Sequence, residues 1–229
     1  DWAANQPINN YLSIADSAPP NLNSSNIKSW QPPLSVRDTA NPYHWIERGN
    51  QLWRIGRISE ARGSFEKAIQ LKEDLYLAWF AKGFTLGFDR QFDRALAACD
   101  RAIELNVLPT KIKYESFRCK AGALQQLQRL EEALTALEQA LTINSDNSAD
   151  WMFKGELSFA LGEYQSALLS LNRAVELRVS QQISPSSLLH NNRALVALEL
   201  EEHDLALSDV EQAIAIDANF APAWRNKGL

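Results

Sequence analysis

Apolar residues along most of the chain recur every three or four positions, a spacing that is typical of amphipathic helices. In the stretch AWFAKGFTLGF at residues 78–88, Trp79, Gly83 and Leu86 fall on one helical face. A second apolar face consists of phenylalanines four residues apart: Phe80, Phe84 and Phe88. A surface helix needs only one apolar face. The second face therefore indicates either a binding surface or additional core packing.

These helical segments also repeat along the chain. Alanines recur at intervals of 34 to 39 residues: Ala61, Ala95, Ala133, Ala167 and Ala206. A ring precedes each alanine by sixteen residues: Trp45, Trp79, Phe117, Trp151 and His190. A small residue follows each ring by four positions: Gly49, Gly83, Ala121, Gly155 and Ala194. The pattern predicts helix pairs in which the small residue lets another helix approach closely. Such pairs bury their apolar faces only by stacking on neighbouring pairs.

The repeated pattern resembles that of the tetratricopeptide repeat family, which has a similar order of rings, small residues and alanines over 34 residues. Two segments carry the signature residues in order: Trp79, Gly83, Leu86, Ala95, Cys99 and Ala102, and Trp151, Gly155, Tyr164, Ala167, Leu171 and Ala174. The resemblance covers about residues 42–229. It implies an all-α fold, a right-handed superhelical solenoid of antiparallel helix pairs.

The resemblance divides the chain into an N-terminal segment and a repeat domain at 42–229. The repeats lie at about 42–75, 76–109, 114–147, 148–181 and 187–220, with a partial repeat at 221–229. Insertions follow the second and fourth repeats, near NVLPTKIK and RVSQQISPS. The last repeat ends inside a helix, so we expect the native protein to continue. Residues 1–41 hold five prolines and no helical period, which predicts an extended or irregular segment.

Charge and composition exclude several classes of function. The net charge is −5 and the pI is near 5.3, which disfavours nucleic acid as a partner. No apolar run reaches the length of a membrane span. The two cysteines, Cys99 and Cys119, have no metal-binding spacing, so we expect two free buried thiols. Unpaired cysteines favour a cytoplasmic location. The residues at the repeat positions resemble those of bacterial members of the family.

The sequence contains no catalytic signature. The HExxH, GxSxG, P-loop, GxGxxG and EF-hand patterns are all missing from it. We therefore expect a protein that is not an enzyme, without cofactor or metal. His190 stands at a ring position and is expected to be structural, and His203 to lie in a solvated acidic turn.

The resemblance assigns binding to a concave groove lined by the first helix of each repeat. The candidate groove residues are Tyr43, Ile46, Asn50, Trp53, Arg54, Leu77, Phe80, Phe84, Phe88, Glu115, Arg118, Gln125, Gln126, Met152, Glu156, Phe159, Leu188, Asn191, Leu195 and Glu199. Their phenylalanines would form an aromatic floor with Tyr43 and Trp53, because exposed apolar patches mark interaction sites. Alternatively, these phenylalanines belong to the core.

Two features narrow the kind of ligand. Some family members grip a terminal carboxylate with Lys and Asn on successive first helices, but Ile46, Glu115 and Cys119 stand at those positions here. Glu156 and Glu199 make the other end of the groove negative. A peptide with apolar anchors followed by a basic residue would suit this surface.

Three functional hypotheses follow. The first is a non-catalytic scaffold that binds a protein or peptide partner in the groove. In the second, residues 1–41 occupy the groove through Trp30 and Leu34, as a cap or an autoinhibitory plug. The third is a regulatory module of a larger enzyme. The open last repeat would also allow self-association.

Overall fold

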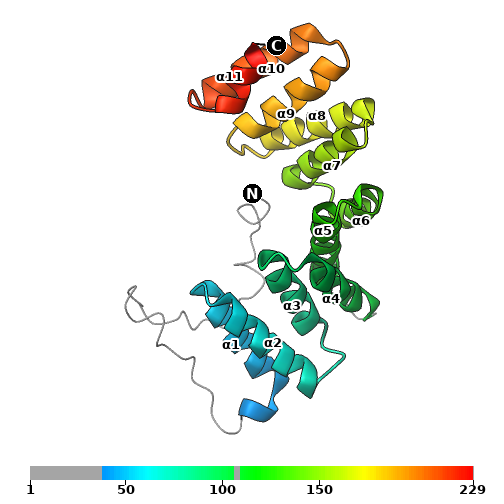
Figure 1. The fold of residues 1–229 in the computed structure, drawn as a ribbon, viewed down its shortest axis with the longest axis vertical. Coiled ribbons are helices and arrows are strands. Elements are labelled where there is room, and N and C mark those ends of the chain that lie inside the picture. Colours follow the sequence, from blue (N-terminus) through cyan, green and yellow to red (C-terminus); the bar gives the residue numbers. More distant parts are fainter. Residues whose placement is uncertain (1–37, 106–108, 229) are drawn as a thin grey trace. The chain divides into compact units, whose positions relative to one another are not determined.

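The computed structural model of the chain describes residues 38–105 and 109–228 (Figure 1). These residues form eleven α-helices and one short 3-10 helix, η2 (Asp38–Ala40), and the described part contains no strand. The all-α fold predicted from the repeats is therefore confirmed. Most of the predicted irregular segment, with its proposed anchors Trp30 and Leu34, lies outside the described residues.

The chain divides into two compact units, at Leu127 and Gln128. The first unit runs from blue to green in Figure 1, and each of its helices packs on the next one in sequence. Its helices are α1 (Pro42–Arg54), α2 (Ile58–Leu71), α3 (Tyr76–Phe88), α4 (Phe92–Glu104) and α5 (Thr110–Gln126).

The second unit has the same construction from successive packed helices. Its helices are α6 (Leu130–Ile143), α7 (Ser148–Ala160), α8 (Tyr164–Ser180), α9 (Ser187–Glu199), α10 (His203–Ile216) and α11 (Ala221–Lys227). The third predicted repeat thus contributes α5 to the first unit and α6 to the second. None of the described helices has the length and apolar character needed to cross a membrane.

The predicted insertions lengthen two helices. Helices α5 and α8 have 17 residues each, whereas the other helices of the five predicted repeats have 13 or 14. Helix α5 begins at Thr110, before the predicted start of its repeat at residue 114. Four residues amount to about one helical turn, so an insertion of this size extends a helix instead of forming a loop.

The small residues predicted between helices do allow close approach. A Cβ atom added to Gly49 would lie 2.4 Å from the ring of Phe65, which is fully buried. An added Cβ on Gly155 would lie 2.6 Å from Leu171. Carbon atoms in contact normally stay about 3.5–4.0 Å apart. Only glycine therefore permits the observed packing of α1 on α2 and of α7 on α8.

Residues with a positive φ, in the left-handed region, form the turns between the two helices of a pair. Gly56 and Gly162 both have φ of +77° there, a conformation that glycine adopts without strain. Equivalent turns instead use Arg90, Gln128 and Glu201, with φ of 59° to 60°. A side chain in this region costs about 1–2 kcal/mol. The fold therefore fixes this turn geometry even where the sequence does not favour it.

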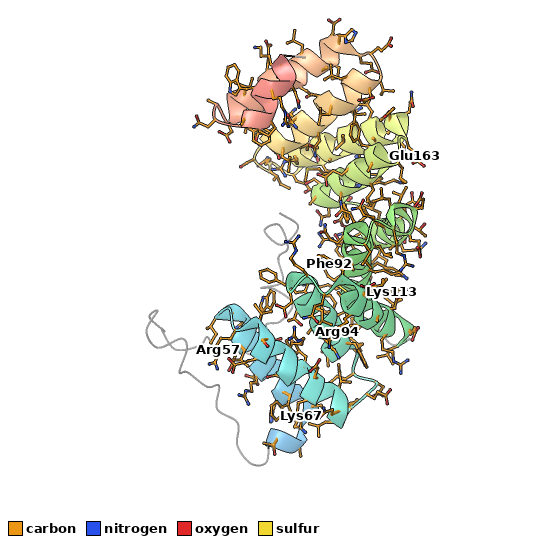
Figure 2. All side chains as sticks on the ribbon, in the orientation of Figure 1. Arg57, Lys67, Phe92, Arg94, Lys113 and Glu163 are labelled. Atoms are coloured by element: carbon orange, nitrogen blue, oxygen red, sulfur yellow. A yellow bond between two sulfur atoms is a disulfide. The ribbon has the colours of Figure 1, made fainter. Side chains whose placement is uncertain are left out.

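A shared set of polar contacts fixes the ring positions. The indole N–H of four tryptophans donates to the carbonyl oxygen six residues earlier, at 2.7 to 2.9 Å: Trp45, Trp79, Trp151 and Trp224. A lysine three residues after the ring pairs with a glutamate of the preceding helix in three places, at 2.8 to 3.2 Å: Lys82–Glu66, Lys154–Glu138 and Lys227–Glu211. Arg94, which Figure 2 labels on α4, also approaches Glu66, at 3.9 Å.

The expectation of two free thiols is wrong. The sulfur atoms of Cys99 and Cys119 form a disulfide that joins α4 to α5, with the two Cα atoms 6.3 Å apart. Sequence spacing did not reveal this pair because the insertion before α5 separates the two residues by 20 positions. The cytoplasmic location, which rested on unpaired cysteines, loses that support and stays a prediction.

Candidate functional site

The predicted aromatic floor is mostly core. Phe80 is 2% exposed and packs with Ala102 and Ile112, and Phe84 is 6% exposed within the α1–α3 core. Phe88 is 44% exposed. Of the two explanations for the second apolar face, the core accounts for Phe80 and Phe84, because α3 is packed on more than one side.

A smaller aromatic cluster remains at the end of α3. The ring of Trp53 stands edge-on to both Phe84 and Phe88, with centroids 5.1 Å apart in each pair. Tyr43 lies at the other end of α1, where the ammonium group of Lys72 approaches its ring at 5.9 Å. Since α1 rises about 1.5 Å per residue, Tyr43 is separated from Trp53 by about 15 Å. The structure does not join them in one floor.

The polar groove candidates of the first unit are largely engaged in packing. Asn50 is buried, and Arg54 and Gln125 are half-buried. Arg118 is buried and binds the Glu115 carboxylate at 3.0 Å, with its guanidinium group 5.4 Å from the Tyr114 ring centroid. A guanidinium group held in this way is not available to grip a ligand carboxylate.

A cleft does exist in the second unit, between α7 and α9. It has a volume of about 220 Å³. Apolar side chains and one acid line it: Gly155, Glu156, Phe159, Leu171, Leu188, Asn192, Leu195 and Val196. An apolar concave site with a few converging polar groups is the usual form of a binding site. This cleft is the best candidate in the described residues.

Glu156 is the acidic group of this cleft. Burial raises the pKa of its carboxyl group, and a hydrogen bond from the Asn192 amide, at 2.9 Å, partly opposes that effect. The carboxylate thus sits in an environment that poorly compensates its charge. A cation brought into the cleft would meet a carboxylate that water solvates incompletely.

The cleft includes several predicted groove residues but not all of them. Glu156, Phe159, Leu188 and Leu195 line it as expected. Met152 is half-buried against the core of α8 and α9 instead. Asn191 and Glu199 also lie outside the cleft. Glu199 is exposed at the end of α9, and the buried Asn191 accepts a hydrogen bond from Asn226 of α11, at 2.8 Å.

Asn192 is the cleft residue that sequence reasoning missed. The family pattern assigned its neighbour Asn191 to the groove, one position away. The spacing gave no signal, because Asn192 follows Glu156 by 36 residues, whereas the ring and alanine positions of these two repeats lie 39 apart.

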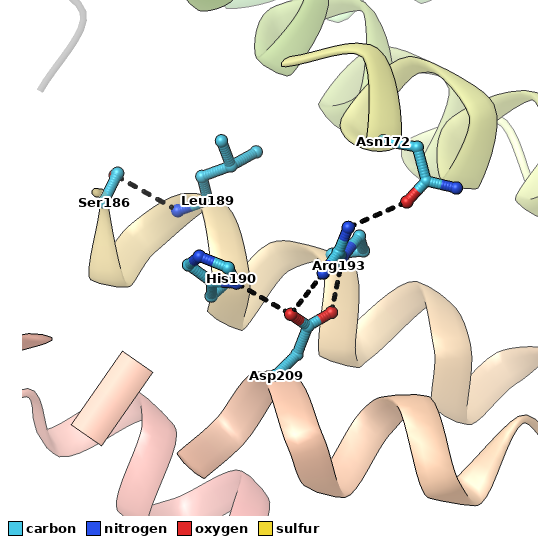
Figure 3. A network of polar contacts seen from close by, with 6 residues as sticks. All are labelled: Asn172, Ser186, Leu189, His190, Arg193 and Asp209. Carbon is cyan, nitrogen blue, oxygen red and sulfur yellow. Dashed lines mark hydrogen bonds and ion pairs between the residues drawn. The ribbon is translucent and has the colours of Figure 1, made fainter. Parts of the chain in front are cut away.

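A buried ionic network joins α8, α9 and α10, as Figure 3 shows. Asp209 of α10 is 1% exposed; it pairs with Arg193 at 2.6 and 2.7 Å and with Nδ1 of His190 at 2.7 Å. Arg193 also donates to the Asn172 side chain of α8, at 2.9 Å. Burial alone would raise the pKa of Asp209, but the hydrogen bonds from His190 and Arg193 and the Arg193 charge outweigh it and lower that pKa.

This network connects three helices. His190, Arg193 and Asp209 join α9 to α10, and Asn172 extends the connection to α8. A polar partner for His190 explains why an imidazole replaces the usual ring, so its predicted structural role agrees with its contacts. His203 begins α10 and is exposed. Within the described ranges, no group of three or more His, Cys, Asp or Glu residues is arranged to hold a metal ion.

Comparison with solved structures identifies the same architecture elsewhere. The structure of YrrB, described as a TPR protein with an unusual peptide-binding site, is 18% identical and covers 84% of this chain and 95% of its own, with a TM-score of 0.71. A MamA fragment from Desulfovibrio magneticus RS-1 is 13% identical over 81% of this chain and 99% of its own, with a TM-score of 0.70. PilW, a type IV pilus biogenesis factor, is 16% identical and covers 82% of this chain and 84% of its own, with a TM-score of 0.71.

Two curated proteins are also similar in sequence. Stress-induced-phosphoprotein 1 of Caenorhabditis elegans is 22% identical over 206 residues, which cover 77% of this chain and 62% of that protein. Human protein O-mannosyl-transferase TMTC1 is 31% identical over 102 residues, which cover 44% of this chain and 11% of that protein. The chain therefore spans less than two thirds of each relative.

The family model of the tetratricopeptide repeat matches residues 120–187, which include the α7 and α8 residues of the cleft but not those of α9. Outside this match, the α1–α2 and α3–α4 pairs carry the same ring, glycine and alanine positions. Trp79 and Trp224 make the same indole contact, and Lys82 and Lys227 make the same ion pair. Residues 120–187 thus match the tetratricopeptide repeat family, and the family resemblance seen in the sequence is confirmed.

Proposed function

We propose that the chain is a non-catalytic interaction scaffold that binds a segment of a partner protein in the α7–α9 cleft. The observation that carries this proposal is the cleft itself, which combines an apolar lining with one poorly solvated carboxylate. The likeness to YrrB, whose description mentions a peptide-binding site, supports the class of ligand.

The size of the cleft favours a peptide over a small metabolite. Sites for small-molecule ligands usually measure about 300–1,000 Å³, whereas this cleft measures about 220 Å³. That volume suits one side chain of a longer segment, which would continue along the neighbouring helices. Leu188, 39% exposed at the start of α9, would contact such a segment.

The TMTC1 relationship favours a second candidate, in which the chain is an interaction module of a larger enzyme. The matched region is a small part of that transferase. A module of this kind would bind through the same cleft and would show no turnover alone. Occupation of a groove by residues 1–41, and self-association through the last repeat, stay predictions.

A random dodecapeptide library displayed on phage, selected on the immobilised chain, tests the proposed scaffold. Enriched peptides are then synthesised and titrated calorimetrically against Leu188→Ser and Leu207→Ser. Leu207 is 51% exposed on α10 and does not line the cleft, so it provides the matched control.

Full burial of a leucine contributes about 1.5–3 kcal/mol. Covering the exposed 39% of Leu188 would therefore contribute about 0.6–1.2 kcal/mol, or roughly 3- to 8-fold in affinity. We expect Leu188→Ser to weaken binding by this factor and Leu207→Ser to leave it unchanged. Failure to enrich any peptide, or equal effects of both substitutions, would contradict the proposal.

A further inference from the structure

We propose that the α7–α9 cleft binds a lysine or arginine side chain of the partner segment, with Glu156 as its counter-ion. This inference rests on the proposed function and specifies what the cleft recognises. It commits to one occupant, a basic residue flanked by apolar residues in a peptide chain.

Glu156 differs from the other acids near the helix contacts of the second unit. Glu138 and Glu211 each have a lysine partner, at 2.8 and 3.1 Å, and Asp209 has Arg193. In the described part of the chain, Glu156 accepts a hydrogen bond from a neutral amide, Asn192, and forms no ion pair with a lysine or arginine side chain.

The basic residues nearest to Glu156 and Asn192 in the sequence already pair with other acids. Lys154, two residues before Glu156, pairs with Glu138. Arg193, next to Asn192, is held by Asp209 and Asn172. Moving either cation to Glu156 would remove the basic partner of another acid, and Asp209, which is fully buried, would keep only His190; losing such a partner is strongly unfavourable. A cation for Glu156 must therefore come from outside these contacts.

The lining of the cleft suits the two parts of a basic side chain. Lysine and arginine have apolar stems that pack on apolar surface while the charged head reaches a polar group. Phe159, Leu188 and Leu195 supply apolar surface, and the carboxylate of Glu156 supplies the acceptor. Asn192 holds that carboxylate from the α9 side, at 2.9 Å.

Other occupants fit the residues less well. A metal ion would need several oxygen, nitrogen or sulfur ligands, whereas the cleft has one carboxylate and one amide among apolar groups. An anionic ligand would be repelled by Glu156. A purely apolar side chain would further desolvate the carboxylate without pairing it, which is costly.

The test uses the selected peptides against four proteins: the native chain, Glu156→Gln, Asn192→Ala and Glu163→Gln. Gln at position 156 keeps the shape and can still accept from Asn192, so the fold is retained. Glu163, labelled in Figure 2, is exposed before α8 and outside the cleft, and it controls for the loss of one negative charge. Each peptide is also made with norleucine in place of its basic residue.

We expect enrichment of lysine or arginine at one fixed position beside apolar residues. Glu156→Gln should weaken these peptides about 10- to 100-fold, the range for a buried charge-assisted hydrogen bond. Glu163→Gln should change affinity by less than about twofold. Norleucine peptides should bind Glu156→Gln at least as tightly as the native chain, because norleucine desolvates the native carboxylate without pairing it.

Two results would overturn the inference. Peptides that bind without a basic preference, or that lose equal affinity with Glu156→Gln and Glu163→Gln, would refute the counter-ion role and leave the scaffold function intact. If no peptide is enriched, the proposed function fails as well, and circular dichroism of the four proteins confirms that each is folded.

Discussion

Substitution of Gly49 by alanine tests how the helices of a repeat pack. Gly49 lies on α1 against the fully buried ring of Phe65 on α2. A Cβ atom at position 49 would lie 2.4, 2.7 and 2.8 Å from three carbons of that ring. Normal contact requires about 3.5 Å, so the ring or α1 would have to move by roughly 1 Å.

Two opposing effects determine the stability of the Gly49→Ala variant. Overpacking a core typically costs about 1–3 kcal/mol. Replacing glycine by alanine inside a helix gains about 1 kcal/mol, independently of packing. Gly63, on the exposed face of α2, provides the matched control, because a Cβ there meets no atom within 4 Å.

The difference between the two variants isolates the packing cost, because the helix gain is common to both. We expect Gly63→Ala to be about 1 kcal/mol more stable than the native chain, and Gly49→Ala to be about 1–3 kcal/mol less stable than Gly63→Ala. Urea denaturation followed by circular dichroism measures the free energy of unfolding of both variants. Equal m-values would show that both expose the same surface on unfolding, so that the two free energies can be compared. A Gly49→Ala variant as stable as Gly63→Ala would refute the close approach of α1 and α2.

Three further predictions concern the turns, the disulfide and the buried ionic network. Glu201→Gly should stabilise the chain by about 1 kcal/mol in urea, because φ at this turn is 59°; no gain would contradict that turn geometry. Peptide mapping by mass spectrometry should recover Cys99 linked to Cys119, and reduction should cost up to about 3 kcal/mol for a loop of this length; free thiols in the native chain would contradict the bond. Asp209→Asn should cost about 3–5 kcal/mol near neutral pH, because Arg193 loses its partner. Since the folded pKa of Asp209 is lowered, its stabilisation is complete above the ordinary carboxyl pKa of 3.8 and is lost as pH falls through the lower folded value; a pH-independent difference between native and variant would refute this assignment.

The repeat pattern was sufficient to predict the fold because its spacing has a direct packing cause. Gly49 and Gly155 recur where two helices touch, and Ala61 and Ala167 recur on the partner helix. Such positions are constrained in every repeat, so a single sequence displays them several times. The all-helical fold and the role of the small residues followed from this regularity.

The candidate site was harder to predict because groove positions vary between repeats. Phe80 and Phe84 occupy groove positions by family pattern, yet they are buried in the core of the first unit. Neither exposure nor partner choice can be read from periodicity alone. Asn192 was missed for a related reason, since its role depends on its contact with Glu156 one repeat earlier.

The disulfide illustrates a different limit. Cys99 and Cys119 sit on successive helices, and their proximity depends on how α5 packs on α4. Nothing in the spacing of two lone cysteines specifies that arrangement. Contacts that depend on the packing of one helix on the next therefore required the structure.

The most direct measurement of the central claim is an NMR titration of the chain with the tightest-binding library peptide. The account predicts that the Asn192 side-chain amide and the backbone amides of residues 155–159 and 188–196 shift together, while amides around Leu207 do not. Saturable binding with unchanged signals at Asn192 and Glu156, and shifts confined to other helices, would show that the partner does not occupy the α7–α9 cleft.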